Sequence, residues 1–76
     1  MAALFLIIFT LMNKNDIGSY VIARRDALDI SQARLAELSG LSVHTISNLE
    51  TGSGNVTLET LLKVADILGL KVHLGV

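Results

Sequence analysis

The stretch SQARLAELSGLSVHTISNLETG (residues 31–52) has the pattern of two short amphipathic helices joined by a tight turn. Ser31 and Ser42 each precede a run of helix-forming residues, and a Ser at that position accepts a hydrogen bond from a free backbone N–H at the helix start. Gly40 separates the two runs, where a chain leaving a helix commonly needs a positive φ. The predicted helices cover residues 32–39 and 43–51.

The apolar residues of this stretch predict which side of each helix is buried, because they recur at the three- and four-residue spacing of a helix face. The first helix would bury Leu35, Ala36 and Leu38. The second would bury Ile46 and Leu49.

Helical spacing continues on both sides of the stretch. Upstream, apolar residues predict a helix over 16–28, with the acidic Asp16 at its N-terminus. Downstream, Thr57 is an N-cap and Gly69 a stop for a fourth helix. The predicted buried stripe of that helix is Leu58, Leu61, Leu62, Ala65 and Leu68, with Val64 and Ile67 on its flanks. The sequence thus predicts an all-α fold of four helices over 13–69.

The end of the chain changes period. In LKVHLGV (70–76), apolar residues alternate with polar residues or Gly, which is typical of a half-buried β-strand. A single strand leaves its backbone groups without partners, so it needs the same strand of a second chain or the N-terminal segment beside it. We favour an antiparallel pair of C-terminal strands across the two-fold axis of a homodimer. The predicted dimer interface is Leu70, Val72, Leu74 and Val76.

The start of the chain, MAALFLIIFTLM (1–12), is its most apolar run. It is shorter than the ~17–25 residues with which a helix spans a bilayer. It also has neither the positively charged start nor the small-residue cleavage site of a secretory signal. We interpret it as an N-terminal extension that an upstream start codon adds to the domain. The alternatives are a strand buried at a dimer interface and, less favoured, a membrane anchor.

The composition narrows the range of functions. The chain has 76 residues, a formal net charge of −1 and no Cys, so it forms one small domain without disulfides or thiolate metal sites. His73 has no accompanying Cys or carboxylate pattern, and no nucleophile elbow, phosphate-binding loop or zinc-helix motif occurs. We therefore expect no enzyme activity, no metal and no cofactor, and we expect a cytoplasmic protein.

The stretch 31–52 resembles the helix-turn-helix of the Cro/lambda-repressor (XRE) family. The similarity extends over about 16–69. It implies a lambda-repressor-like fold and a DNA-binding transcriptional regulator, with 13–69 as the DNA-binding domain and 70–76 as a dimerisation strand. The tail resembles the HipB-like subgroup, whose members are dimeric autorepressors and often antitoxins of HipA-type kinases. The residues that carry the family resemblance are Gln32, Ala36, Gly40, Ile46 and Glu50-Thr51-Gly52.

The resemblance implies that the helix over 43–51 lies in the major groove of double-stranded DNA. The chemistry of its exposed residues suits that role. Asn48 can pair with adenine N6 and N7, His44 can donate to a guanine acceptor, and Val43 can contact a thymine methyl group. The implied base contacts are Val43, His44, Ser47 and Asn48.

Phosphate contacts are implied around the same two helices. Gln32 begins a helix, where its amide and the backbone N–H groups favour an anion. In the family, an Arg seven residues before this Gln pairs with the Glu that ends the recognition helix, which implies a clamp between Arg25 and Glu50. The implied phosphate contacts are Gln32, Ser42, Thr45, Thr51, Ser53 and Asn55.

Two functions remain open. The first is a homodimeric repressor or autorepressor that reads a palindromic operator with one recognition helix per subunit. The second is an antitoxin-type interaction module that neutralises a HipA-like kinase toxin, with DNA binding secondary. The net charge of −1 motivates the second, because proteins that bind nucleic acids usually carry a basic surplus.

Overall fold

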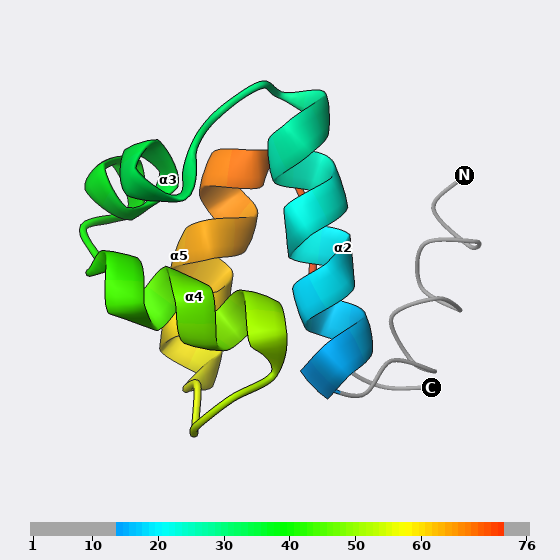
Figure 1. The fold of residues 1–76 in the computed structure, drawn as a ribbon, viewed down its shortest axis with the longest axis vertical. Helices are drawn as coiled ribbons and strands as arrows, with labels where there is room; N and C mark the ends of the chain where they lie inside the picture. Colours follow the sequence, from blue (N-terminus) through cyan, green and yellow to red (C-terminus); the bar gives the residue numbers. More distant parts are fainter. Residues whose placement is uncertain (1–13, 73–76) are drawn as a thin grey trace.

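The computed structural model describes residues 14–72 and is helical throughout its ordered elements (Figure 1). In Figure 1, α2 stands beside α4 and α5, α5 lies between α2 and α3, and α4 runs below α3 toward α2. The helix α2 packs most extensively against α4, and α3 packs against both α4 and α5. The four helices are α2 (Lys14–Ala27), α3 (Gln32–Ser39), α4 (Val43–Thr51) and α5 (Leu58–Leu68).

Local hydrogen bonds set the ends of the last three helices, as the sequence predicts. At α4, the Ser42 hydroxyl accepts a hydrogen bond from the Thr45 backbone N–H at 3.0 Å, and Ser31 and Thr57 cap α3 and α5 in the same way. Each of these helices ends at a Gly with a φ of 69–72°, which suits a residue without Cβ. The helix expected over 16–28 begins and ends slightly earlier, as α2.

The cap of α5 provides a direct test of this local control. Replacement of Thr57 with Ala removes the acceptor for the Thr60 N–H, which lies 3.1 Å from the Thr57 hydroxyl oxygen. We expect the free energy of unfolding to fall by about 1 kcal/mol. Denaturant unfolding followed by circular dichroism measures this loss, and the Thr57→Ser variant, which keeps the acceptor, should unfold like the unsubstituted chain. An unchanged T57A variant would show that the cap adds nothing.

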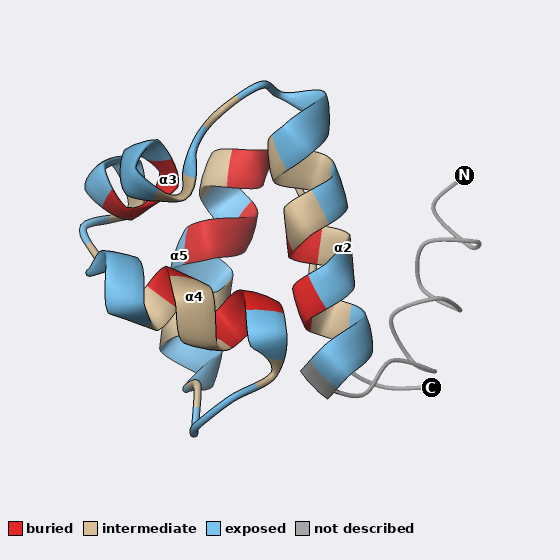
Figure 2. Cartoon of the chain, in the orientation of Figure 1, coloured by how far each residue is buried: buried red, intermediate tan, exposed pale blue. Residues whose placement is uncertain are grey.

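The core forms where the four helices meet, and Figure 2 shows buried segments of α2, α4 and α5 facing one another. The side chains of Leu35, Ile46 and Val64 are completely buried. Ile17, Ile30, Leu41, Val56, Leu61, Ile67 and Leu70 pack around this core and are partly buried. Ala36, Ile46 and Leu49 are buried as predicted.

The prediction of burial was wrong for three residues: Leu38, Leu58 and Leu62 are 42%, 50% and 46% exposed, respectively. On α5, Ala65 and Leu68 are buried and Leu61 is partly buried, as predicted, and the buried side extends to Val64, because α3 and α2 cover that side of the helix. The apolar residues of α5 occupy more of the helix surface than the neighbouring helices can cover. The spacing of these residues alone did not show which of them face the core.

A close approach between α2 and α4 was not anticipated from the sequence. Gly18 is buried in the middle of α2 and lies against the end of α4. A Cβ atom at Gly18 would lie 2.7 Å from the Leu49 carbonyl oxygen and closer still to that of Glu50. Real Cβ atoms do not approach backbone atoms this closely, so only Gly permits the observed crossing. The sequence feature that could have indicated this close crossing is Gly18 itself, a Gly inside a predicted helix.

The ends of the chain lie largely outside the described residues. These include the extension 1–12 and most of the predicted strand 70–76, with Leu74 and Val76. Residues 70–72 are described and are not in a strand. Leu70, a predicted dimer contact, packs against the core of its own chain, and its N–H donates to the Ala65 carbonyl oxygen at 2.8 Å. In residues 14–72, no helix is long and apolar enough to cross a membrane.

Candidate nucleic-acid interface

The helices α3 and α4 form a compact helix-turn-helix. The Leu41 N–H donates to the Ala36 carbonyl oxygen at 2.9 Å, which closes α3 and turns the chain into α4. Ile46 and Leu49 then anchor α4 in the core. This anchoring leaves the opposite side of α4 toward solvent.

The four predicted base-contacting residues lie along this outer side of α4. Val43 is 46% exposed at the start of the helix, and His44 is exposed one residue further on. Ser47 and Asn48 follow one turn later and are half-buried. The structure also brings His44 and Asn48 together, since His44 Nε2 lies 3.3 Å from Asn48 Nδ2.

The predicted phosphate contacts fall into three places. Ser42 and Thr45 lie at the N-terminus of α4, where their hydroxyl oxygens are 2.9 Å apart. At the other end of α4, the Thr51 hydroxyl donates to the Ser47 carbonyl oxygen at 2.9 Å and lies 2.9 Å from the Ser53 hydroxyl oxygen. Asn55 is exposed in the following loop.

Gln32, the remaining predicted phosphate contact, lies at the start of α3, in a hydrogen-bond network around Glu50. The resemblance implied the Arg25–Glu50 part of this network but not the part that Gln32 plays in it. Gln32 Nε2 donates to Glu50 Oε1 at 2.8 Å. Arg25 Nε donates to Glu50 Oε2 at 2.7 Å, and Arg25 Nη2 donates to Glu50 Oε1 at 3.2 Å. The remaining guanidinium nitrogen, Arg25 Nη1, donates to the Ile30 carbonyl oxygen at 3.0 Å. Both Glu50 oxygens therefore have partners, and one carboxylate joins α2, α3 and α4.

The network is shielded from solvent. The Glu50 side chain is 2% exposed and that of Arg25 is 15% exposed. The hydrogen bonds that Arg25 donates to Glu50, together with the negative charge of Glu50, raise the pKa of Arg25 above its usual value despite the opposing effect of burial. The Arg25 guanidinium therefore stays charged at any pH at which the domain would be used.

Most of the cationic side chains of the described residues have local partners. Arg24 Nε donates to the Leu68 carbonyl oxygen at 2.8 Å, so it caps the C-terminus of α5. Arg34 pairs with Glu37 on α3, and Lys63 lies 3.7 Å from Glu59 on α5. Little of the positive charge is thus reserved for an anionic ligand. The N-termini of α3 and α4 provide additional partial positive charge near the outer side of α4.

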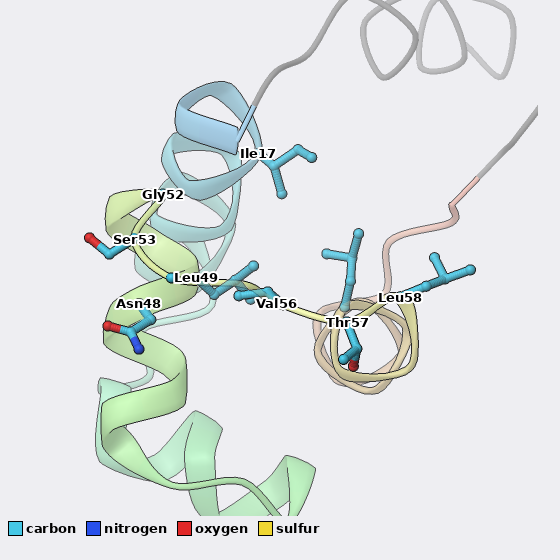
Figure 3. Close-up of a pocket in the computed structure, with 10 residues that line it drawn as sticks. Ile17, Asn48, Leu49, Gly52, Ser53, Val56, Thr57 and Leu58 are labelled. Carbon is cyan, nitrogen blue, oxygen red and sulfur yellow. The ribbon is translucent and has the colours of Figure 1, made fainter.

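An apolar groove of about 100 Å³ runs behind this surface. Figure 3 shows Leu49 and Val56 between α4 and α5 with Ile17 extending from α2, while Asn48 of α4 and Ser53 of the following loop extend away from α5. Asn48 lies at the rim of the groove, and its polar atoms extend away from the apolar lining.

A four-helix core that carries a helix-turn-helix, with a polar outer side on the second helix of the pair, defines a DNA-binding fold. The chain matches the helix-turn-helix family over residues 21–74, which is more than half of its length. It therefore belongs to the helix-turn-helix family, of the XRE (Cro/lambda-repressor) type, and is a DNA-binding protein of the transcription-regulator class. A search of curated proteins found no match.

Family membership also bears on catalysis, since this fold is a regulator fold that is not typically enzymatic. Within residues 14–72, no group of three or more His, Cys, Asp or Glu side chains could hold a metal ion. The HipB-like resemblance depends on the tail beyond α5, most of which lies outside the described residues.

Proposed function

We propose that the protein is a sequence-specific transcriptional repressor or autorepressor that reads its operator through the outer side of α4. The observation that carries this proposal is the division of α4 into two sides. Ile46, Leu49 and Glu50 fix the helix to the rest of the domain. The polar outer side is left free to enter a major groove.

The base-reading residues of the proposal are Val43, His44, Ser47 and Asn48. Around them, hydroxyl and amide groups at both ends of α4 suit the phosphate backbone, which fixes the register of a protein on DNA. These phosphate contacts are Gln32, Ser42, Thr45, Thr51, Ser53 and Asn55. One N–H of Gln32 Nε2 is donated to Glu50, and its second N–H and the backbone N–H groups at the start of α3 are the donors proposed for a phosphate.

The proposed assembly is a homodimer in which the chain beyond α5 supplies the contact between subunits. Two copies of α4 would then enter successive major grooves about 34 Å apart and read a palindrome. Because most cations of the described residues have local partners, affinity should fall less steeply with salt than it does for a strongly basic binder.

Replacement of Asn48 with Ala tests the base-reading side directly. The variant loses the side chain that can pair with adenine, so we expect a loss of about 1–3 kcal/mol at one base pair of each half-site and relaxed preference there. Selection of bound duplexes from a random pool defines the preferred site, and fluorescence anisotropy on single-base variants measures the loss.

The matched control is Ala23→Ser, an uncharged substitution at an exposed position of α2 outside the helix-turn-helix. It should select the same site as the unsubstituted protein. Failure of the folded, unsubstituted protein to enrich any sequence at low salt would overturn the proposed function.

A further inference from the structure

We propose that His44 and Asn48 act as one reading unit, in which His44 sets the orientation of the Asn48 carboxamide and thereby the base that Asn48 prefers. The proposal rests on the proposed function, since it requires α4 to contact base edges. It assigns His44 a positioning role in place of an independent base contact.

The geometry places the two side chains on one side of α4, one helical turn apart. Asn48 Nδ2 lies 3.3 Å from His44 Nε2. The amide nitrogen is also near the loop that follows α4, since a Cβ atom built on Gly54 would be 3.6 Å from it. The amide nitrogen therefore lies close to both the imidazole ring and the loop that follows α4.

Hydrogen-bonding chemistry fixes the roles in this pair. An amide NH₂ group can only donate, so His44 Nε2 must accept and the ring proton of the neutral imidazole must be on Nδ1. One Asn48 N–H is then used by His44, and the second N–H and the carbonyl oxygen are available to a ligand. This donor and acceptor pair matches N7 and the N6 amino group of adenine.

Protonation of His44 reverses the arrangement. The imidazolium takes one proton from solvent at Nε2, and both ring nitrogens then donate. The carboxamide must turn so that its oxygen accepts from Nε2, which directs both of its N–H groups outward. A pair of donors no longer matches adenine and instead matches the N7 and O6 acceptors of guanine. The preferred base at this position should therefore change with pH.

In residues 14–72, no charged side chain forms an ion pair with the His44 ring. The charged residues of α3 pair with each other, Arg25 of α2 pairs with Glu50, and Arg24 binds the end of α5. The described charged groups on α4 and the elements packed against it are Asp16, Arg24, Arg25, Asp26, Arg34, Glu37, Glu50, Glu59, Lys63 and Asp66.

The test compares binding of paired duplexes that carry adenine or guanine at the Asn48-dependent position, at pH 8.0 and pH 5.5 and constant ionic strength. The other histidine, His73, is replaced by Gln so that the response reports on His44 alone. We expect adenine to be preferred by about tenfold at pH 8.0 and guanine to gain at least as much relative affinity at pH 5.5. The His44→Phe variant, whose ring neither accepts nor titrates, should lose the pH dependence.

Two results would overturn the proposal while leaving the proposed function intact. One is specific, Asn48-dependent binding whose base preference is the same at both pH values. The other is an equal pH response in His44→Phe. A third readout needs no DNA, because nitrogen NMR of the free protein should show an unprotonated Nε2 on His44 at pH 8.0. A proton on that atom would contradict the pairing, whereas absence of any selected site would contradict the proposed function.

Discussion

Replacement of Glu50 with Ala is expected to lower the free energy of unfolding by about 3–5 kcal/mol, the cost of breaking a buried ion pair by removing one partner. The Glu50 side chain is 2% exposed and accepts three hydrogen bonds, two from Arg25 and one from Gln32. Without it, the guanidinium of Arg25 stays largely buried with only part of its hydrogen bonding satisfied. A loss of this size is comparable to the whole stability of a small domain.

The chain contains a matched control in the exposed pair of Glu59 and Lys63. Glu59→Ala removes the same group from a pair 3.7 Å apart, but the Glu59 side chain is 81% exposed. Because exposed ion pairs contribute little to stability, this variant should unfold almost like the unsubstituted protein. Urea unfolding at one fixed protein concentration measures both. Equal effects of the two substitutions would show that Glu50 is not a clamp.

The second large effect is expected at Gly18. Replacement with Ala places a Cβ atom 2.7 Å from the Leu49 carbonyl oxygen. The clash is with backbone atoms, so relief requires α2 and α4 to move apart. We expect a loss of about 3 kcal/mol, at the upper end of overpacking effects. This outweighs the roughly 1 kcal/mol that Ala gains over Gly in helix propensity.

The adjacent Ser19 provides the control for this substitution. Ser19 is exposed on α2, so Ser19→Ala changes helix propensity without touching α4. Thermal unfolding of both variants separates the two contributions. A Gly18→Ala variant that melts above the unsubstituted protein would contradict the close crossing.

The displacement of α4 that Gly18→Ala requires should also weaken DNA binding by this variant, because it moves the base-reading residues.

The outer side of α4 was largely predictable from the sequence. Ile46 and Leu49 identify the inner side, and helical periodicity then leaves His44 and Asn48 on the other. The contact between these two side chains was not predicted, since residues four apart lie within reach but their rotamers decide whether they meet. The role of Gln32 in the Glu50 network was likewise missed, because it depends on how α3 packs beside α4.

The sequence by itself determined where α3, α4 and α5 begin and end. These limits depend on Ser and Thr hydroxyls and on Gly residues that act within one turn of their own positions. Helical spacing predicted the burial of Ile46 and Leu49, but only the tertiary structure decided how far the buried side of α5 extends. Leu58 and Leu62 are exposed while Val64 is enclosed, because burial depends on which neighbouring helices cover a surface. The crossing at Gly18 is of the same kind, since it joins segments far apart in the chain.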